Sequence, residues 1–423
     1  MSGFSGYLKA LGPGLLWAAT AIGVSHLVQS TRAGALYGFS LVGVVVLVNL
    51  LKYPLFEAGP RYAVATGRSL IEGYVAQGRW AVGVYLVVTV GTMFTVLAAV
   101  TLVTGGLAQA LFGAALSAVG WSAAALAVCA LILVVGRFPL LDRVIKAIIV
   151  LLALSTLIAF VVALERFGEA PASPPLELDG PTIAFLVALL GWMPTGMDAA
   201  AWHSLWTLER GRQTAHRASW REARFDFNLG YFGTVAIALA FLTLGALVLR
   251  PSGAPLAGSA GGFAAQLVEV YVATLGEWSR PVLLVAAFTT MFSTTLAVSD
   301  GFPRVLAHLG SVLLRPAATG SAGDALRDPS RAYWPILAVL MLGALGLIVY
   351  LQRSFTTLID LATTLSFLTA PVIGYLNLRA VCAPEIPSTM RPPGWWRGVA
   401  WSALALLGVL GAVYLWIRLV AGS

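Results

Sequence analysis

The chain has 423 residues, of which 59% are hydrophobic and only 10% are charged, and its mean hydropathy is +0.88. A soluble domain carries about 25% charged residues, so this composition excludes an ordinary soluble protein and indicates one embedded in a lipid bilayer. The net charge of +8 does not indicate nucleic-acid binding, because most basic residues fall on one predicted side of the membrane.

Eleven apolar runs are long enough to cross a bilayer, which takes about 20 residues each. They span residues 12–36, 39–60, 81–108, 114–136, 140–164, 181–208, 226–249, 281–303, 332–352, 356–380 and 397–419. Strands of a membrane barrel alternate apolar and polar residues, whereas these runs are continuous. The sequence therefore predicts an all-α membrane protein with eleven transmembrane helices.

The distribution of Lys and Arg predicts how these helices are oriented. Most of the 26 basic residues, Lys52 among them, fall at helix ends and in loops on the side of the N-terminus. Positive charge resists translocation, so we expect a multi-pass protein of the cell (inner) membrane with a cytoplasmic N-terminus and an external C-terminus.

Two of the apolar runs are interrupted near their middles. The first break is Gly23–His26, and the second is Met193–Asp198. Unwound backbone at membrane depth is tolerated only where it is buried in protein or lines a wet cavity. A pair of such breaks in corresponding halves of a chain indicates the substrate site of a transporter.

Each broken helix is the first of a group of five predicted helices. An odd number of helices per group inserts the second group upside down, which is the inverted-repeat architecture. We therefore expect a first repeat over residues 1–165, a second repeat over 166–380, and an additional helix within 381–423.

Polar and small residues at the breaks are the candidate substrate ligands. His26 is the only histidine predicted near the membrane midplane, and Asp198 is the only carboxylate beside either break; an ionisable group at this depth is a functional hypothesis by default. Both are candidate metal ligands, although a histidine bonded to backbone and an aspartate capping a half-helix are structural alternatives. The full predicted substrate-binding set is Gly23, Ser25, His26, Met193, Thr195, Gly196, Met197 and Asp198.

Two further groups of residues have candidate roles. Thr290, Ser293 and Thr294 lie in one predicted helix, where their hydroxyls offer a sodium site, although such hydroxyls also bond back to their own helix. Asp300 and Arg304, with Asp142 and Arg143, offer a cytoplasmic gate; a plain interfacial ion pair is the alternative.

Several classes of function have no support in the sequence. We find no Ser/His/Asp set, phosphate-binding loop or metal-protease motif, so we do not expect an enzyme, a bound cofactor, a nucleic-acid partner or a protein partner. The expected partners are a small inorganic ion and the lipid bilayer, with Na⁺ or H⁺ as a coupling ion.

The sequence resembles the Nramp (natural resistance-associated macrophage protein) family of divalent-metal transporters. The likeness is clearest at Gly12-Pro13, at Ala33–Leu41 and Val48–Leu51, and at the pairs Met193-Pro194 and His203-Ser204. It implies the LeuT-type fold, a 5+5 inverted repeat in which the first and sixth helices are discontinuous. It also implies uptake of Mn²⁺ or Fe²⁺ with protons.

The chain departs from the family at its metal-binding motifs. The first-helix motif Asp-Pro-Gly-Asn falls on Gly23–His26, which has no carboxylate. In the sixth helix, the Met-Pro-His motif aligns in two alternative ways. If Met193-Pro194 is matched, the motif's histidine falls on Thr195. If His203-Ser204 is matched, the motif's methionine falls on Gly196 and its histidine on Asp198. The resemblance therefore identifies a divergent branch of the family.

Two functional hypotheses follow for this branch. The first is a secondary transporter that moves a small inorganic ion, with a divalent metal cation as the leading substrate, by alternating access around a midplane site. The second is a sodium-coupled carrier of a small anion such as bicarbonate, or of a small polar solute, on the same fold. Its anion contacts would be the two half-helix N-termini, His26 and Arg32.

Overall fold

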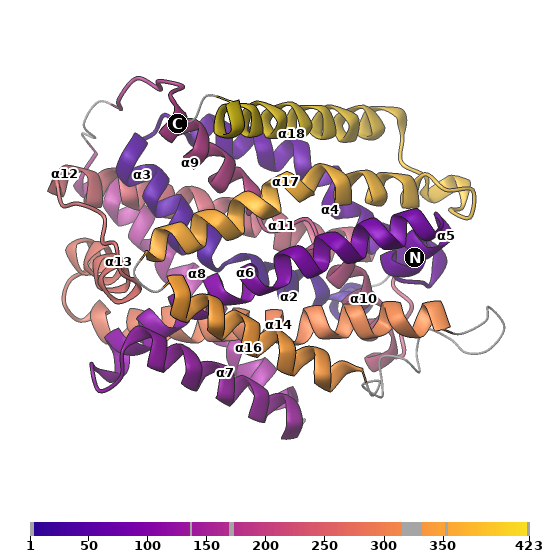
Figure 1. Cartoon of the computed structure of the whole chain (residues 1–423), viewed down its shortest axis with the longest axis horizontal. Helices are drawn as coiled ribbons and strands as arrows, with labels where there is room; N and C mark the ends of the chain where they lie inside the picture. The colour runs from indigo at the N-terminus through magenta and orange to yellow at the C-terminus, as the bar shows by residue number, and fades with distance from the viewer. Residues whose placement is uncertain (1–3, 136–137, 169–172, 315–331, 352–353, 421–423) are drawn as a thin grey trace.

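The computed structural model describes residues 4–135, 138–168, 173–314, 332–351 and 354–420. These residues form helices and no strand, which confirms the all-α class. The long helices run side by side along one direction, with the N-terminal end of the chain at the right of Figure 1 and the C-terminal end of α18 toward the left.

The first half of the chain contains the first broken helix and the four long helices that follow it. Its elements are α1 (Phe4–Ala10), α2 (Pro13–Ala21), the π-helical turn η1 (Ser25–Ser30), α3 (Thr31–Tyr37), α4 (Val42–Thr66), α5 (Leu70–Ala76), α6 (Arg79–Phe112), α7 (Ala118–Val135) and α8 (Phe138–Arg166).

The second half begins with the second broken helix. Its elements are α9 (Gly180–Gly191), α10 (Ala199–Gln213), α11 (Trp220–Leu244), η2 (Gly245–Leu249), α12 (Arg250–Ser252), α13 (Ala260–Leu275), α14 (Ser279–Leu314), α16 (Tyr333–Leu351), α17 (Phe355–Val381), η3 (Ser388–Met390) and α18 (Gly394–Val420).

Eight helices in the described part of the chain are long and apolar enough to cross a membrane. They coincide with eight of the eleven predicted runs. The other three runs fall on the broken pair α2 and α3, on α8, and on the broken pair α9 and α10. The total of eleven membrane crossings stays a prediction.

Each broken helix packs closely against a long helix of the other half. A Cβ atom added to Gly14 of α2 would lie 2.0 Å from the carbonyl oxygen of Asp226 in α11, and one added to Gly59 of α4 would lie 2.3 Å from that of Ala200 in α10. Only glycine permits such an approach. In chain order, α4 follows the first broken helix and α11 follows the second, so the two contacts are reciprocal.

The first half-helix of each broken pair, α2 and α9, is capped by a carboxylate at its start. Asp226 accepts hydrogen bonds from the amides of Gly12 and Gly14 at 2.8 and 2.6 Å, at the start of α2. Asp179 precedes α9 and accepts from the amide of Thr182 at 2.9 Å. Hydrogen bonds from Thr182 lower the pKa of the Asp179 carboxyl. Both carboxylates stabilise the positive end of a helix dipole.

Candidate functional site at the two helix breaks

The first break lies between α2 and η1. The amide of Gly23 donates to the carbonyl of Ala21 at 2.8 Å rather than to a carbonyl four residues back, so the α-helical pattern ends here. The hydroxyl of Thr294, from α14, donates to the carbonyl of Ala19 at 3.2 Å. A side chain from a distant helix therefore satisfies backbone that the break leaves unpaired.

The second break consists of residues 192–198, between α9 and α10, and includes a cis Met193-Pro194 peptide bond. The ammonium of Lys52 donates to the carbonyls of Leu190 and Met193, at 2.5 and 3.2 Å. The prediction that Lys52 lies at a cytoplasmic helix end is wrong. Its side chain is fully buried in the middle of α4, because a carbonyl in the last turn of α9 and one in the unwound segment after it supply hydrogen-bond acceptors there.

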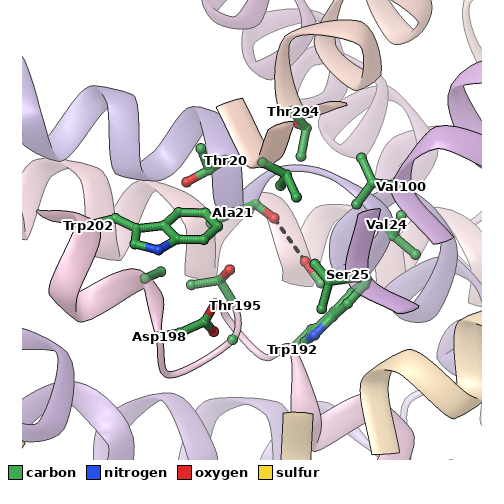
Figure 2. Close-up of a pocket in the computed structure, with 14 residues that line it drawn as sticks. Thr20, Ala21, Val24, Ser25, Val100, Trp192, Thr195, Asp198, Trp202 and Thr294 are labelled. Atoms are coloured by element: carbon green, nitrogen blue, oxygen red, sulfur yellow. Dashed lines mark hydrogen bonds between the residues drawn. The ribbon is translucent and has the colours of Figure 1, made fainter. Parts of the chain in front are cut away.

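The two breaks enclose a small cavity of about 40 Å³, shown in Figure 2. The hydroxyl of Ser25 lies at their junction, with its oxygen 2.8 and 3.3 Å from the carbonyl oxygens of Ala21 and Pro194. The lining comes from α2, η1, α6, the second break, α10 and α14. It consists of Thr20, Ala21, Val24, Ser25, Val96, Val100, Trp192, Thr195, Gly196, Asp198, Ala199, Trp202, Thr294 and Val298.

Asp198 provides the only carboxylate among these lining residues. It immediately precedes α10, yet its side chain makes no capping hydrogen bond, and it forms no ion pair with a described residue. Figure 2 shows its carboxylate on the same side of the cavity as Thr195. A partly buried carboxylate that neither caps a helix nor pairs with a cation is available to bind one.

The predicted substrate ligands separate into two groups. Ser25, Thr195, Gly196 and Asp198 line the cavity, whereas Gly23, His26, Met193 and Met197 do not. Met193 and Met197 are almost completely buried in the surrounding core. No group of three or more His, Cys, Asp and Glu residues that would hold a metal ion occurs within the described residues.

His26 is fully buried, and both of its ring nitrogens have partners. Nε2 lies 3.0 Å from the carbonyl oxygen of Thr234 in α11, and Nδ1 lies 2.7 Å from the hydroxyl of Ser25. Nε2–H donates to the carbonyl, so Nδ1 of the neutral ring is an acceptor and competes with the carbonyls of Ala21 and Pro194 for the single proton of the Ser25 hydroxyl. The imidazole therefore orients Ser25, which itself lines the cavity.

Of the predicted sodium site, only Thr294 lines the cavity. Its hydroxyl lies 3.2 Å from the carbonyl oxygen of Ala19 and 3.1 Å from that of Thr290. Ser293 and Thr290 are buried outside the lining. The combination of a hydroxyl and carbonyls from the first break stays a candidate site for a monovalent cation.

Of the predicted gate, Asp300 and Arg304 form an ion pair at 2.8 Å within α14. The hydroxyl of Tyr333, from α16, also donates to Asp300 at 2.6 Å. The side chains of Asp142 and Arg143 lie outside the described residues. The pair therefore joins α14 to α16, and its role as a gate stays a prediction.

Sequence reasoning missed the aromatic part of the lining. Trp202 lies one helical turn after Asp198, and this spacing places both on one face of α10. The indole nitrogen of Trp202 is buried without a hydrogen-bond partner. Trp192 has its indole N–H bonded to the hydroxyl of Ser366 in α17 at 2.7 Å. Trp202 could have been found from its position four residues after Asp198. Trp192 could have been found from its position directly before the predicted break.

A helical membrane protein with two interrupted helices around a cavity that contains a carboxylate belongs to the class of secondary transporters. The family model for natural resistance-associated macrophage protein-like (Nramp) proteins matches residues 14–417. The chain therefore belongs to the Nramp family, and it is a transporter rather than an enzyme. It is also 33% identical over 383 residues to the uncharacterized protein PM0681 of Pasteurella multocida (strain Pm70), covering 89% of this chain and 86% of that protein.

Solved structures identify the fold as LeuT-type. The chain is similar to the Eremococcus coleocola manganese transporter, with a TM-score of 0.67 and 15% identity over 98% of this chain and 88% of that one. It is also similar to MhsT, solved in complex with L-phenylalanine, with a TM-score of 0.60 and 12% identity over 95% of this chain and 97% of that one. At these identities the likeness shows the fold alone.

Proposed function

We propose that this protein carries a divalent metal cation across the membrane by alternating access, with Asp198 as the anionic ligand. The observation that carries the proposal is the unpaired carboxylate in a cavity between the two breaks. Membership of the Nramp family supports it, as does the similar fold of a protein described as a manganese transporter.

The lining favours a hard cation such as Mg²⁺ or Mn²⁺. Its polar atoms are hydroxyl, carboxylate and carbonyl oxygens and indole nitrogens, and no methionine sulfur faces the cavity. Oxygen ligands suit Mg²⁺ and Mn²⁺, whereas thioether sulfur suits softer metals. A water molecule needs about 10–15 Å³ of cavity volume, so about 40 Å³ accommodates an ion that keeps some of its water.

The placement in the membrane forms part of the proposal. We place the N-terminus in the cytoplasm and the C-terminus outside, in the cell (inner) membrane, with repeats over residues 1–165 and 166–380 and a further helix within 381–423. The reciprocal packing of α2 on α11 and α10 on α4 supports a two-repeat division. Na⁺ or H⁺ would be the coupling ion.

A second candidate is the sodium-coupled carrier of a small anion. It is favoured by the unpartnered indole N–H of Trp202, which lines the cavity, and by the absence of a carboxylate from the first break. Arg32 gives it less support, because the guanidinium is paired with Asp360 at 2.7 Å.

Transport by purified protein in lipid vesicles distinguishes the two candidates. Uptake of radioactive Mn²⁺, with Mg²⁺ as a competitor, is expected without a sodium gradient if the first proposal holds. Sodium-dependent uptake of labelled bicarbonate, with no uptake of either metal, would refute the first and support the second. Empty vesicles provide the background.

A further inference from the structure

Lys52 is a fully buried lysine in the middle of α4. Its ammonium has two hydrogen-bond acceptors, the carbonyls of Leu190 and Met193, and it forms no ion pair with any carboxylate in the described parts of the chain. Lysine is almost never fully buried unless paired. The proposed transport route through the cavity does not use it.

The position of the ammonium is that of a cation at a helix terminus. α9 ends at Gly191, so the carbonyls of Leu190 and Met193 belong to its last turn and to the unwound segment after it. Such carbonyls have no partner within their own helix and carry partial negative charge. In transporters with discontinuous helices, carbonyls at these ends coordinate the coupling Na⁺ or H⁺.

The other tethers of the second break are neutral. Trp192 donates to the Ser366 hydroxyl at 2.7 Å, and the carbonyl of Pro194 accepts from Ser25 at 3.3 Å. Lys52 alone among these tethers supplies a charge. Because that charge is covalently attached to α4, it cannot leave during a transport cycle as a bound ion does.

We propose that the Lys52 ammonium is a resident cation that takes the place of a mobile coupling cation at the carbonyl end of α9. It holds the start of the second break against α4 and leaves Asp198, at the end of the same break, to the transported ion. Only the consequence for transport rests on the proposed function; occupation of the carbonyl end by Lys52 does not.

Chemical rescue of Lys52→Ala tests the proposal. The substitution removes three carbons and the ammonium, which are the atoms of propylammonium. We expect purified Lys52→Ala protein in detergent to melt at a lower temperature, and propylammonium to restore most of the loss in a saturable manner. The neutral analogue propan-1-ol should not restore it. Wild-type protein, whose site is filled, should not respond to propylammonium.

Two further variants serve as controls. Lys52→Met fills the space without the charge, so it should lose stability and not be rescued by propylammonium. Lys9→Ala removes a lysine that is exposed, and it should behave as wild type. Equal rescue of Lys52→Ala by propan-1-ol, or wild-type stability of Lys52→Met, would overturn the proposal, because packing alone would then explain Lys52.

Transport provides a separate readout. If the protein carries Mn²⁺, Lys52→Ala should lower uptake by on the order of 100-fold, as expected for a misplaced binding segment, and propylammonium should restore it. If wild-type protein carries no Mn²⁺, the proposed function fails while the melting experiment still decides the role of Lys52.

Discussion

The hydroxyl oxygen of Ser25, at the end of the first break, lies 3.3 Å from the carbonyl oxygen of Pro194 in the second, a hydrogen-bonding contact between residues 169 apart in the chain. The same oxygen lies 2.7 Å from Nδ1 of His26, whose other nitrogen is bonded to α11. One serine therefore connects both breaks to the helix that supports the first of them.

Replacing Ser25 by alanine should weaken binding of the transported ion without unfolding the protein. Loss of a typical hydrogen bond costs about 1 kcal/mol, which corresponds to roughly a fivefold higher KM for Mn²⁺ in vesicle uptake. Ser155→Ala is the matched control, because among the described residues that hydroxyl bonds only to the carbonyl of Leu152 in its own helix. Equal KM values for the two variants would show that the junction does not contribute to binding.

Asp198→Asn should have a larger effect, because it removes the only carboxylate of the cavity lining while keeping its size. We expect the affinity for Mn²⁺ and for Mg²⁺ to fall by on the order of 100-fold, the upper range reported for changes around metal ligands. The affinity for each metal is measured from the rise in melting temperature of the purified protein as the metal is added. Glu177→Gln, an exposed carboxylate in the segment before α9, is the control, and unchanged metal binding in Asp198→Asn would refute the proposed ligand.

Met197→Leu should leave the ratio of Mn²⁺ to Mg²⁺ affinity unchanged. The side chain is 2% exposed and does not line the cavity, and a swap of similar volume costs less than about 1.5 kcal/mol in a core. Competition between the two metals in vesicle uptake measures the ratio. A selective loss of Mn²⁺ would mean that the sulfur reaches the ion in another conformation.

The fold was predictable because its signals are long and repetitive. Apolar runs of about 20 residues identify helices from composition alone, and glycine and proline at two corresponding places identify the breaks. The helical class and the LeuT-type fold followed from these features and from the family resemblance.

The arrangement of side chains within the site was less predictable. The position of the second break was predicted from its glycine and proline. The cation that binds the carbonyls at its start was not, because Lys52 is 138 residues from Leu190 in the chain. The distribution of basic residues had predicted Lys52 at a cytoplasmic helix end. His26 had the residue type of a ligand, yet its ring is bonded to Thr234, 208 residues away. Contacts of this kind depend on packing, which a single sequence does not reveal.

The ion pair between Arg32 of α3 and Asp360 of α17, at 2.7 Å, joins the C-terminal part of the first broken helix to the second half of the chain. Arg32 is 8% exposed and also donates to Gln29 at 2.9 Å. Removing the carboxylate leaves a buried charge without its counterion, which is strongly unfavourable. We therefore expect Asp360→Asn to favour conformations in which α3 and α17 are separated and the cavity is open on that side.

Alkylation of a cysteine placed in the cavity measures this opening. In a Cys129→Ala/Cys382→Ala background, Ala199→Cys should react faster with a membrane-impermeant reagent, added on the side of α3, when Asp360→Asn is present. Glu269→Gln is the matched control, because it breaks an ion pair between exposed side chains, Arg280 and Glu269, at 2.6 Å. Such pairs contribute about 0–1 kcal/mol, so its reaction rate should stay unchanged. Equal rates in all three proteins would show that the Arg32–Asp360 pair does not hold the cavity closed.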